Sequence, residues 1–307
     1  MLVSHENVHT WEEKSISKVA TWRNLYTVYD GENESDFFES DLDEKIENKI
    51  PKIIEKIKKN KKLTRKQLIY LMKFVSVQAY RTPAGYIKMQ KMIENFMPDI
   101  LDDLGTKMMK TKPGELENIV KNNNDIDQSL IPLSLEIEEQ KSLIKLSTII
   151  GRETYLQGIK EVSRNKAFNI LLTHNWRIIR PAKGLYFPTS DNPVINLNYY
   201  RKDKYDFNGG WGVDNTCIMM PLTPKHLLYT QVGYNGSIKH LDKSIEWTNF
   251  FVKLITENAR RKVYFHKTSK EIARIRPRTV NSELFEFERK QYNSWSENQI
   301  KAIDSLK

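Results

Sequence analysis

The chain has 307 residues, with 49 Lys or Arg against 39 Asp or Glu, and its formal net charge is +10. This length allows one large domain or two modest ones, with a substantial core that needs no disulfides. The single cysteine, Cys217, excludes an intramolecular disulfide and a cysteine-based zinc site, and it favours a reducing cytosol. The positive charge indicates acidic partners, with nucleic acid first, although a lysine-rich proteome would give the same charge.

The first residues contain no basic segment followed by an apolar stretch, and no window approaches the roughly 18 apolar residues of a membrane span. We therefore expect a cytoplasmic protein with no membrane contact. Short extended pieces are predicted first, over Ser15 to Ala20 and Leu25 to Tyr29. Apolar residues then recur at spacings of three and four from Phe38 to Ile57, which predicts a helix that Pro51 kinks or restarts.

Thr64 is predicted to cap the next helix, which should break before Pro83 because a proline disfavours helical geometry in the residue preceding it. Further helices are predicted over Tyr86 to Leu104, with Pro98 bending or dividing the helix, over Leu135 to Leu156 and over Val162 to Leu172.

From Trp176 onward, short apolar runs separated by turn residues predict a sheet. Asn235-Gly236 is expected to close a hairpin, and helices are expected over Ile245 to Ala259 and Ser282 to Leu306. The sequence therefore predicts a single α+β domain over residues 1–307, in which a mainly helical part (1–172) packs on a mostly antiparallel sheet with a C-terminal helix (173–307). The predicted strands are Trp176 to Ile179, Leu185 to Pro188, Val194 to Leu197, Cys217 to Pro221, Leu227 to Val232 and Val263 to His266.

Positive charge is concentrated in two segments. Residues 49–73 carry ten Lys or Arg against Glu55 alone, and residues 253–278 carry nine against Glu257 and Glu271. These local balances of +9 and +7 leave the rest of the chain at −6. Arginine pairs with phosphate through a planar, two-pronged group, so the arginine-rich second segment is the better candidate for phosphate contact. The first segment is interpreted either as a solvated helix face or as a second surface that contacts phosphate.

The run from Tyr186 to Val194 contains the strongest candidate site. An apolar, strand-like stretch ends there in the turn Ser190-Asp191-Asn192-Pro193. Because a strand fixes the backbone while a turn exposes side chains, Asp191 is the best candidate for an acid, a base or a metal ligand. The same residue types also form ordinary tight turns, in which Asp191 would accept hydrogen bonds from nearby amides. Both interpretations are open.

Other positions are candidates for chemistry. Arg81 ends an apolar helix face, where a guanidinium meets either a bound phosphate or the carboxylate of a structural salt bridge. Glu44 and Glu47 lie three residues apart on one predicted helix face, where two carboxylates can share a divalent cation or simply face solvent. Rings and cations alternate from Tyr199 to Trp211, which is typical either of stacking on unpaired bases or of a loop that packs its own rings. The sequence contains no phosphate-binding glycine loop, dinucleotide fingerprint, zinc-peptidase motif or serine nucleophile elbow.

Several short motifs occur in a characteristic order: Leu25 to Thr27, an acidic helix with Leu42 and Glu47, Arg81 to Pro83, Trp176 to Ile179, Phe187 to Val194, Pro221 to Pro224, and Asn258 to Tyr264. This order, over roughly residues 14–266, resembles the domain of unknown function 4238 family. Members typically open with a His-x-x-Pro motif, which this chain lacks. The resemblance implies a fold and candidate positions rather than a reaction. The polar positions that it carries over are Arg81, Asp191, Asn192, Asn258 and Arg260, with Glu47 as a weaker match.

The leading hypothesis is a cytosolic protein that acts on nucleic acid, in its specific form a metal-dependent nuclease-like effector of bacterial defence or toxin type. Such an enzyme would use Mg²⁺ or Mn²⁺ and cations that hold the substrate phosphates. The alternatives are a non-catalytic module that binds nucleic acid or a protein partner, and a family member with reduced catalysis. The hypothesis assigns catalysis to Asp191, Arg81, Asn192 and Asn258, metal binding to Asp191 and Glu47, and nucleic-acid contact to Arg260, Arg261, Lys262 and Arg276.

Overall fold

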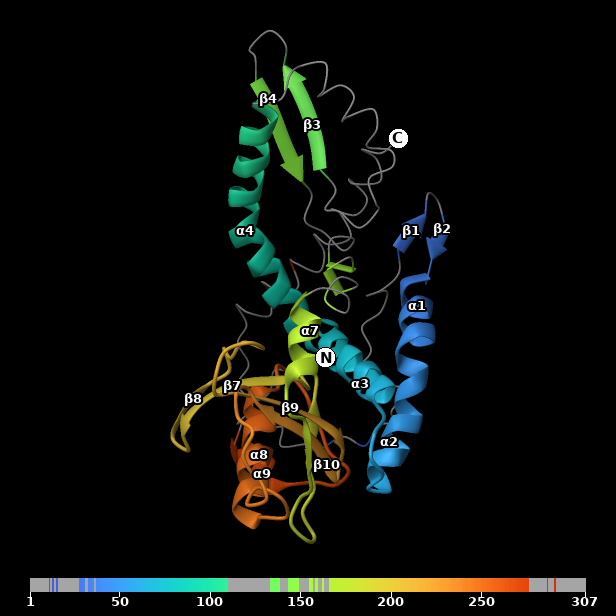
Figure 1. Ribbon diagram of the computed structural model, residues 1–307, viewed down its shortest axis with the longest axis vertical. Helices are drawn as coiled ribbons and strands as arrows, with labels where there is room; N and C mark the ends of the chain where they lie inside the picture. The colour runs from blue at the N-terminus through green and yellow to red at the C-terminus, as the bar shows by residue number, and fades with distance from the viewer. Residues whose placement is uncertain are drawn as a thin grey trace.

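The computed structural model describes residues 11, 13, 15, 28–30, 33–35, 37–109, 133–138, 143–148, 155–156, 158–159, 162, 166–275, 286 and 290. Helices dominate the N-terminal half, and an antiparallel sheet followed by helix α9 (Lys270–Ile275) forms the C-terminal half (Figure 1). The predicted α+β class is confirmed. Of the helix predicted over 282–306, Glu286 and Lys290 are described, and both are helical. The assignment to a single domain stays a prediction.

A short hairpin and two successive helices open the described chain. Strands β1 (Val28–Asp30) and β2 (Asn33–Ser35) pair antiparallel, and α1 (Phe37–Lys45), the 3₁₀ helix η2 (Glu47–Lys49) and α2 (Ile50–Lys58) follow. Pro51 lies in the first turn of α2, where an N–H has no helical partner, so the proline starts a helix without breaking one. The predicted restart is confirmed. The apolar stripe is buried at Leu42, Ile46, Ile50, Ile53 and Ile57.

Helix α3 (Arg65–Tyr80) begins with the predicted cap. The Thr64 hydroxyl accepts a hydrogen bond from the Gln67 amide at 3.3 Å, and the Gln67 side chain accepts one from the Thr64 amide at 3.0 Å. This reciprocal pair is a capping box, which satisfies two amides that the helix leaves without partners. The next helix, α4 (Pro83–Met109), runs through Pro98. The predicted end at Leu104 is therefore wrong, and of the two alternatives for Pro98, a bend or a division, the continuous helix excludes the division.

A β-hairpin replaces the first part of the helix predicted over Leu135 to Leu156. Strands β3 (Leu133–Glu138) and β4 (Leu143–Thr148) pair antiparallel, with Leu135 opposite Leu146. Apolar residues alternate with polar ones in β3, which is the period of a strand, whereas Leu143 and Leu146 of β4 are three residues apart as in a helix. The helix prediction followed the spacing in β4 and missed the alternation in β3. Later in that range, Tyr155 and Leu156 are helical.

Five strands form the central antiparallel sheet in the order β5-β10-β9-β7-β8. They are β5 (Arg177–Ile179), β7 (Ile195–Arg201), β8 (Lys204–Asp206), β9 (Thr216–Thr223) and β10 (His226–Gln231). A separate pair joins β6 (Thr189–Ser190) to β11 (Val263–Tyr264).

Two strand predictions fail in this half. Residues 185–188 form no strand, although the Phe187 amide donates to the Pro224 carbonyl at 2.8 Å. Asn235-Gly236 closes no hairpin, because β10 ends at Gln231 and the chain leads next into helix α8 (Ile245–Asn258).

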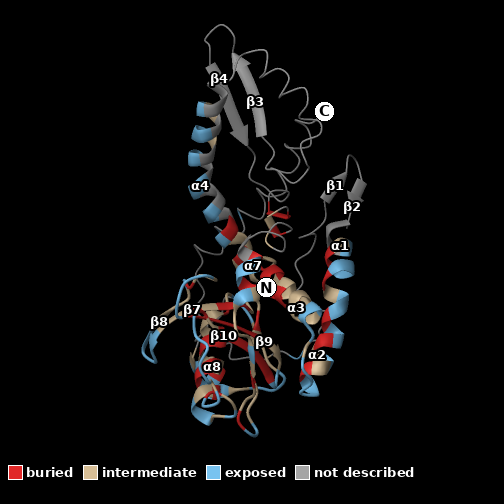
Figure 2. Cartoon of the chain, in the orientation of Figure 1, coloured by how far each residue is buried: buried red, intermediate tan, exposed pale blue. Residues whose placement is uncertain are grey.

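Helices cover both faces of the sheet. Side chains such as Ile218 and Met220 pack with α2, α3 and α7 (Lys166–Thr173), while Cys217 and Met219 pack with α8 on the other face. Successive residues of β9 thus enter opposite cores, which explains their continuous apolar run. Figure 2 shows buried residues in the sheet and on the sides of α2 and α3 that face it.

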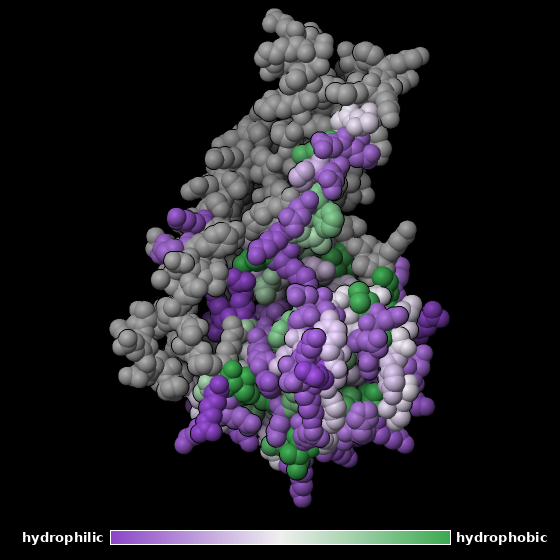
Figure 3. Space-filling view, turned by 90° about the vertical axis from the view of Figure 1, so that its left-hand side faces the viewer, coloured by the Kyte–Doolittle hydropathy of each residue, from purple (hydrophilic) through white to green (hydrophobic). Residues whose placement is uncertain are grey.

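Helix α4 extends away from the sheet, and the β3–β4 hairpin lies beside its far end (Figure 1). The face shown in Figure 3 is mostly hydrophilic over the sheet half, with scattered hydrophobic residues. No helix in the described ranges combines the length and hydrophobicity that a membrane span requires.

Candidate functional site

The predicted turn around Asp191 is held by its own carboxylate. Its Oδ1 accepts a hydrogen bond from the Arg260 amide at 2.8 Å, and its Oδ2 accepts bonds from the amides of Arg261 at 2.8 Å and Lys262 at 3.2 Å. The Asp191 amide in turn donates to the Lys262 carbonyl at 3.1 Å. A carboxylate that accepts three backbone hydrogen bonds fixes the loop that leads from α8 to β11.

Two asparagines fix the same junction reciprocally. The Asn192 side chain donates to the Asn258 carbonyl at 3.0 Å, and the Asn258 side chain donates to the carbonyls of Asn192 at 2.8 Å and Val194 at 3.4 Å. Asn258 is the last residue of α8, so its amide ties the helix end to the turn. The structure thus brings together Asp191, Asn192, Asn258 and the backbone of residues 260–262 as a network of hydrogen bonds.

The arginines after α8 lie beside this network. Burial lowers the pKa of the half-buried Arg260 guanidinium, and the negative charge of Asp191 acts in the opposite direction. The pKa of Arg261 is also lowered, first by desolvation and then by the charge of Arg260. Arginine stays protonated in proteins, so both remain cations. Arg276 lies outside the described residues.

Arg81 and Glu47 contact each other. Arg81 follows the last residue of α3, and its guanidinium forms an ion pair with the carboxylate of Glu47 in η2. The two following residues open α4: the Thr82 hydroxyl accepts from the Gly85 amide at 3.0 Å, and Pro83 is the first helical residue. The Arg-Thr-Pro motif thus forms a helix junction with a salt bridge, which was the structural alternative for Arg81.

A metal site on Asp191 and Glu47 stays a prediction. Both carboxylates already have partners, the backbone amides for Asp191 and the guanidinium for Glu47. Over the described part of the chain, no group of three or more His, Cys, Asp or Glu side chains is placed to hold a metal ion.

Six of the ten cations of the first basic segment lie in the turn between α2 and α3, residues 58–66, which we call the α2–α3 turn. It contains six exposed cations and no acid. Its backbone is fixed at both ends: Asn60 adopts a left-handed φ of 51°, the Lys61 amide donates to the Lys56 carbonyl at 2.9 Å as in a Schellman cap, and Thr64 caps α3. Lys58 pairs with Glu55 at 2.7 Å. The other five cations form no ion pair within the described residues, and they are Lys59, Lys61, Lys62, Arg65 and Lys66.

This turn meets one end of the sheet. Arg180, directly after β5, donates to the Asn60 side chain at 3.4 Å and is paired with Asp242, with Nη2 2.5 Å from Oδ2. His226 begins β10 at this end, and its pKa is lowered by burial and then by the positive charges of Arg180, Lys58 and Lys225. Cations from α2, from the end of β5 and from the β9–β10 turn therefore act on one small region.

A tyrosine and a histidine lie next to Lys225. The Tyr186 and His266 ring centroids are 4.1 Å apart. The ammonium nitrogens of Lys225 and Lys267 lie 5.4 Å and 5.1 Å from the Tyr186 centroid. We call these four residues the Tyr186 cluster. The sequence analysis did not predict this cluster, because its members come from three separate loops. Its only sequence signal was the position of Tyr186 at the start of the run from Tyr186 to Val194.

Most rings of the aromatic run from Tyr199 pack against other rings of the protein. Tyr199 and Tyr205 contact the Phe250 ring of α8, with centroids 5.9 Å and 5.8 Å away, and the Tyr205 hydroxyl donates to Glu257 at 2.6 Å. Tyr200 is the exception, with 63% of its surface exposed. Packing rather than base stacking therefore accounts for most of these rings.

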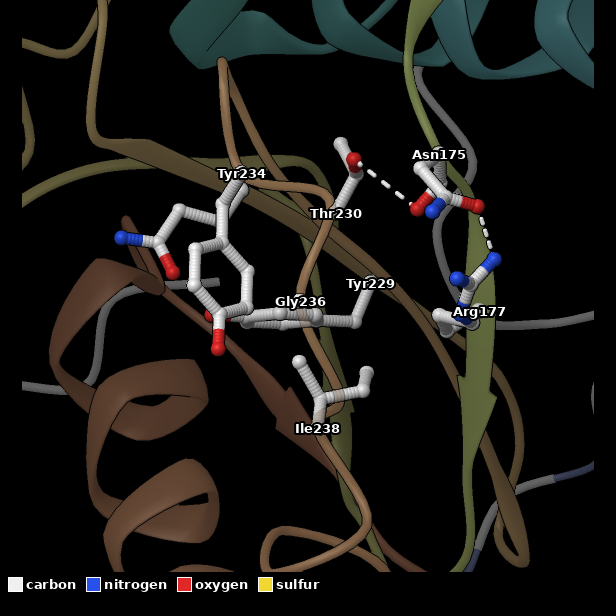
Figure 4. A pocket seen from close by; sticks show the side chains of 8 residues that line it. Asn175, Arg177, Tyr229, Thr230, Tyr234, Gly236 and Ile238 are labelled. Carbon is white, nitrogen blue, oxygen red and sulfur yellow. Dashed lines mark hydrogen bonds between the residues drawn. The ribbon is translucent and has the colours of Figure 1, made fainter.

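A small pocket opens between the end of β10 and the loop that follows it. Tyr229, Tyr234 and Ile238 line it, and Thr230 donates to the Asn175 carbonyl at 3.3 Å at its side (Figure 4). Its volume is about 10 Å³, room for one water molecule. The pocket is too small for an organic substrate.

The fold is thus an α+β arrangement whose predicted polar site is a hydrogen-bonded turn. Residues 3–269 match the family described as "Protein of unknown function (DUF4238)", and the chain belongs to this family. No curated protein matches the chain, and no solved structure matches it. The resemblance drawn from the order of the motifs is confirmed, and the family description names no reaction.

Proposed function

We propose that the protein binds nucleic acid without cleaving it, and that the α2–α3 turn contacts the phosphate backbone. The observation that carries the proposal is a set of five exposed cations that form no ion pair within the described part of the chain, on a turn whose backbone is fixed at both ends. Like charges so close together repel one another and oppose folding unless counterions or an anionic partner screen them. A polyanion would remove this repulsion and release its own counterions, which drives binding.

The turn is a better candidate than the second basic segment, which the sequence favoured. In that segment, Arg260 is half-buried beside Asp191, and Lys253 lies 3.8 Å from the Glu257 carboxylate. Charges that already have an acidic neighbour gain less from a phosphate. The turn cations are exposed, and the helix ends beside them are capped, so the backbone loses little conformational freedom on binding.

The hydrogen bonds of Asp191 support a non-catalytic function. A nuclease that used Asp191 as a metal ligand would have to share this carboxylate between the ion and the three backbone amides that it already accepts. Glu47 would likewise have to share its carboxylate between the ion and Arg81. Such sharing weakens the hydrogen bonds and the ion pair that hold the two junctions, which is costly in a partly buried site.

Binding is tested with a fluorescently labelled oligonucleotide and two triple variants that remove the same charge. Lys59→Gln, Lys61→Gln and Lys62→Gln remove three of the six positive charges of the turn, while Lys88→Gln, Lys91→Gln and Lys239→Gln remove three positive charges from exposed lysines elsewhere. The proposal predicts that the turn variant loses at least tenfold in affinity at low salt, about 1.4 kcal/mol, because three cations that contact phosphate are removed. Equal losses for the two variants would show that only total charge matters and would contradict the proposal.

A further inference from the structure

We infer that the bound nucleic acid is single-stranded at the end of the sheet beside the α2–α3 turn, where Tyr186 and His266 stack with an unpaired base and Lys225 and Lys267 contact the flanking phosphates. This inference rests on the proposed function and specifies its ligand. It concerns the Tyr186 cluster, which is separate from the α2–α3 turn.

The cluster has the composition that single-strand binding requires. A base stacks on an aromatic ring whatever its sequence, and nearby cations neutralise the backbone phosphates. His266 and both lysines are exposed, and Tyr186 is half-buried. Neither Lys225 nor Lys267 forms an ion pair with any acid in the described ranges, so both charges are available to a ligand.

The cluster also lies on the same side of the molecule as the turn. Asn60 of the turn contacts Arg180 at the end of β5, and Ile179 of β5 pairs with Leu227, two residues after Lys225. The Phe187 amide binds the carbonyl of Pro224, which places Tyr186 against the β9–β10 turn. Figure 1 shows the end of α2 beside this end of the sheet. One strand can therefore pass from the turn cations to Tyr186.

A duplex would leave the rings unused. Its bases are paired and stacked inside the helix, so a surface ring reaches only sugar and phosphate. Ring stacking is worth roughly 1–3 kcal/mol per base, which converts to about 5- to 150-fold in affinity. The protein is therefore expected to prefer a single strand to the duplex of the same sequence by at least fivefold.

The test compares three labelled ligands of about 20 nucleotides, longer than a typical single-strand site, by fluorescence anisotropy. They are a single strand, its duplex, and the same strand with abasic sites in place of its bases. The parent protein should bind the single strand at least fivefold more tightly than either of the others. Equal binding of the normal and abasic strands would overturn the inference and leave the proposed function intact, whereas no binding of any ligand at low salt would refute the proposed function itself.

Variants then assign the effect to the cluster. Tyr186→Leu should remove the preference for the normal strand over the abasic strand, while Tyr186→Phe, which keeps the ring, should retain it. Tyr200→Leu is the matched control, because Tyr200 is also a surface tyrosine with a lysine, Lys204, 5.7 Å from its ring centroid. If Tyr200→Leu removes the preference and Tyr186→Leu does not, the placement at Tyr186 is wrong. The abasic comparison needs no variant, so it tests base stacking even if Tyr186→Leu fails to fold.

Discussion

Replacing Asp191 with asparagine is expected to destabilise the protein. Asparagine keeps one oxygen, and its best orientation preserves the bonds from the Arg261 and Lys262 amides while its NH₂ group faces the Arg260 amide, which now lies 2.8 Å from Oδ1. This loses one hydrogen bond to a charged acceptor, about 1.5–3 kcal/mol, and the two remaining bonds become neutral and weaker. The total loss in the free energy of unfolding is about 2–4 kcal/mol.

Urea denaturation measures this loss, with Asp203→Asn as the control. Asp203 pairs with Arg201 at 2.9 Å, but both side chains are at least 70% exposed, so the same substitution should cost less than about 1 kcal/mol there. Nuclease assays with Mg²⁺ and Mn²⁺ complete the test. If the parent cleaves nucleic acid, and Asp191→Asn abolishes cleavage while its stability stays within about 1 kcal/mol of the parent, Asp191 is catalytic and the reasoning above is refuted.

Three further predictions concern stability and reactivity. Thr64→Ala removes the capping box of α3 and should cost about 1 kcal/mol in urea denaturation, whereas an unchanged midpoint would contradict the capping role. His226 has a lowered pKa, so its neutral ring contributes stability that is complete above the ordinary value of 6.5 and is lost as the pH falls below it. As the pH falls from about 8 to 5, the parent should therefore lose more unfolding free energy than His226→Asn does. Equal losses for the two proteins would contradict this. Burial raises the pKa of the Cys217 thiol, so a thiol reagent should label the protein only after unfolding, and rapid labelling of the folded protein would show that the thiol is accessible.

The sequence predicted those parts of the fold in which local chemistry and packing agree. Thr64 with Gln67 forms a capping box, and Pro51 restarts a helix, because both effects act within one turn of helix. It failed at β4, where the three-residue spacing of Leu143 and Leu146 fits a helix as well as a strand, and where pairing with β3 decides the outcome. The signal lay in β3, where apolar and polar residues alternate just before β4.

In the candidate site, too, local features were predictable from the sequence and contacts between distant segments were not. The sequence indicated the turn at Asp191 and the choice between a reactive group and an acceptor of backbone amides, but it placed the preceding strand at Leu185–Pro188 instead of at Thr189–Ser190. The partners that support the second reading, the amides of residues 260–262, lie about seventy residues away in the chain. The Tyr186 cluster joins three loops and could not be found by spacing. The charge of the α2–α3 turn and its Thr64 cap were predicted, but the left-handed Asn60 was not. Nor could the sequence show that five of the six turn cations form no ion pair within the described residues.

The salt dependence of binding tests the central claim most directly. For a single-stranded oligonucleotide, the logarithm of the association constant should fall linearly with the logarithm of the salt concentration, with a slope of about 0.7 for each neutralised phosphate. The variant with Lys59→Gln, Lys61→Gln and Lys62→Gln should reduce the magnitude of that slope by about 2, and the control triple at Lys88, Lys91 and Lys239 should leave it unchanged. Identical slopes for the parent and the turn variant would show that the α2–α3 turn does not contact the phosphate backbone.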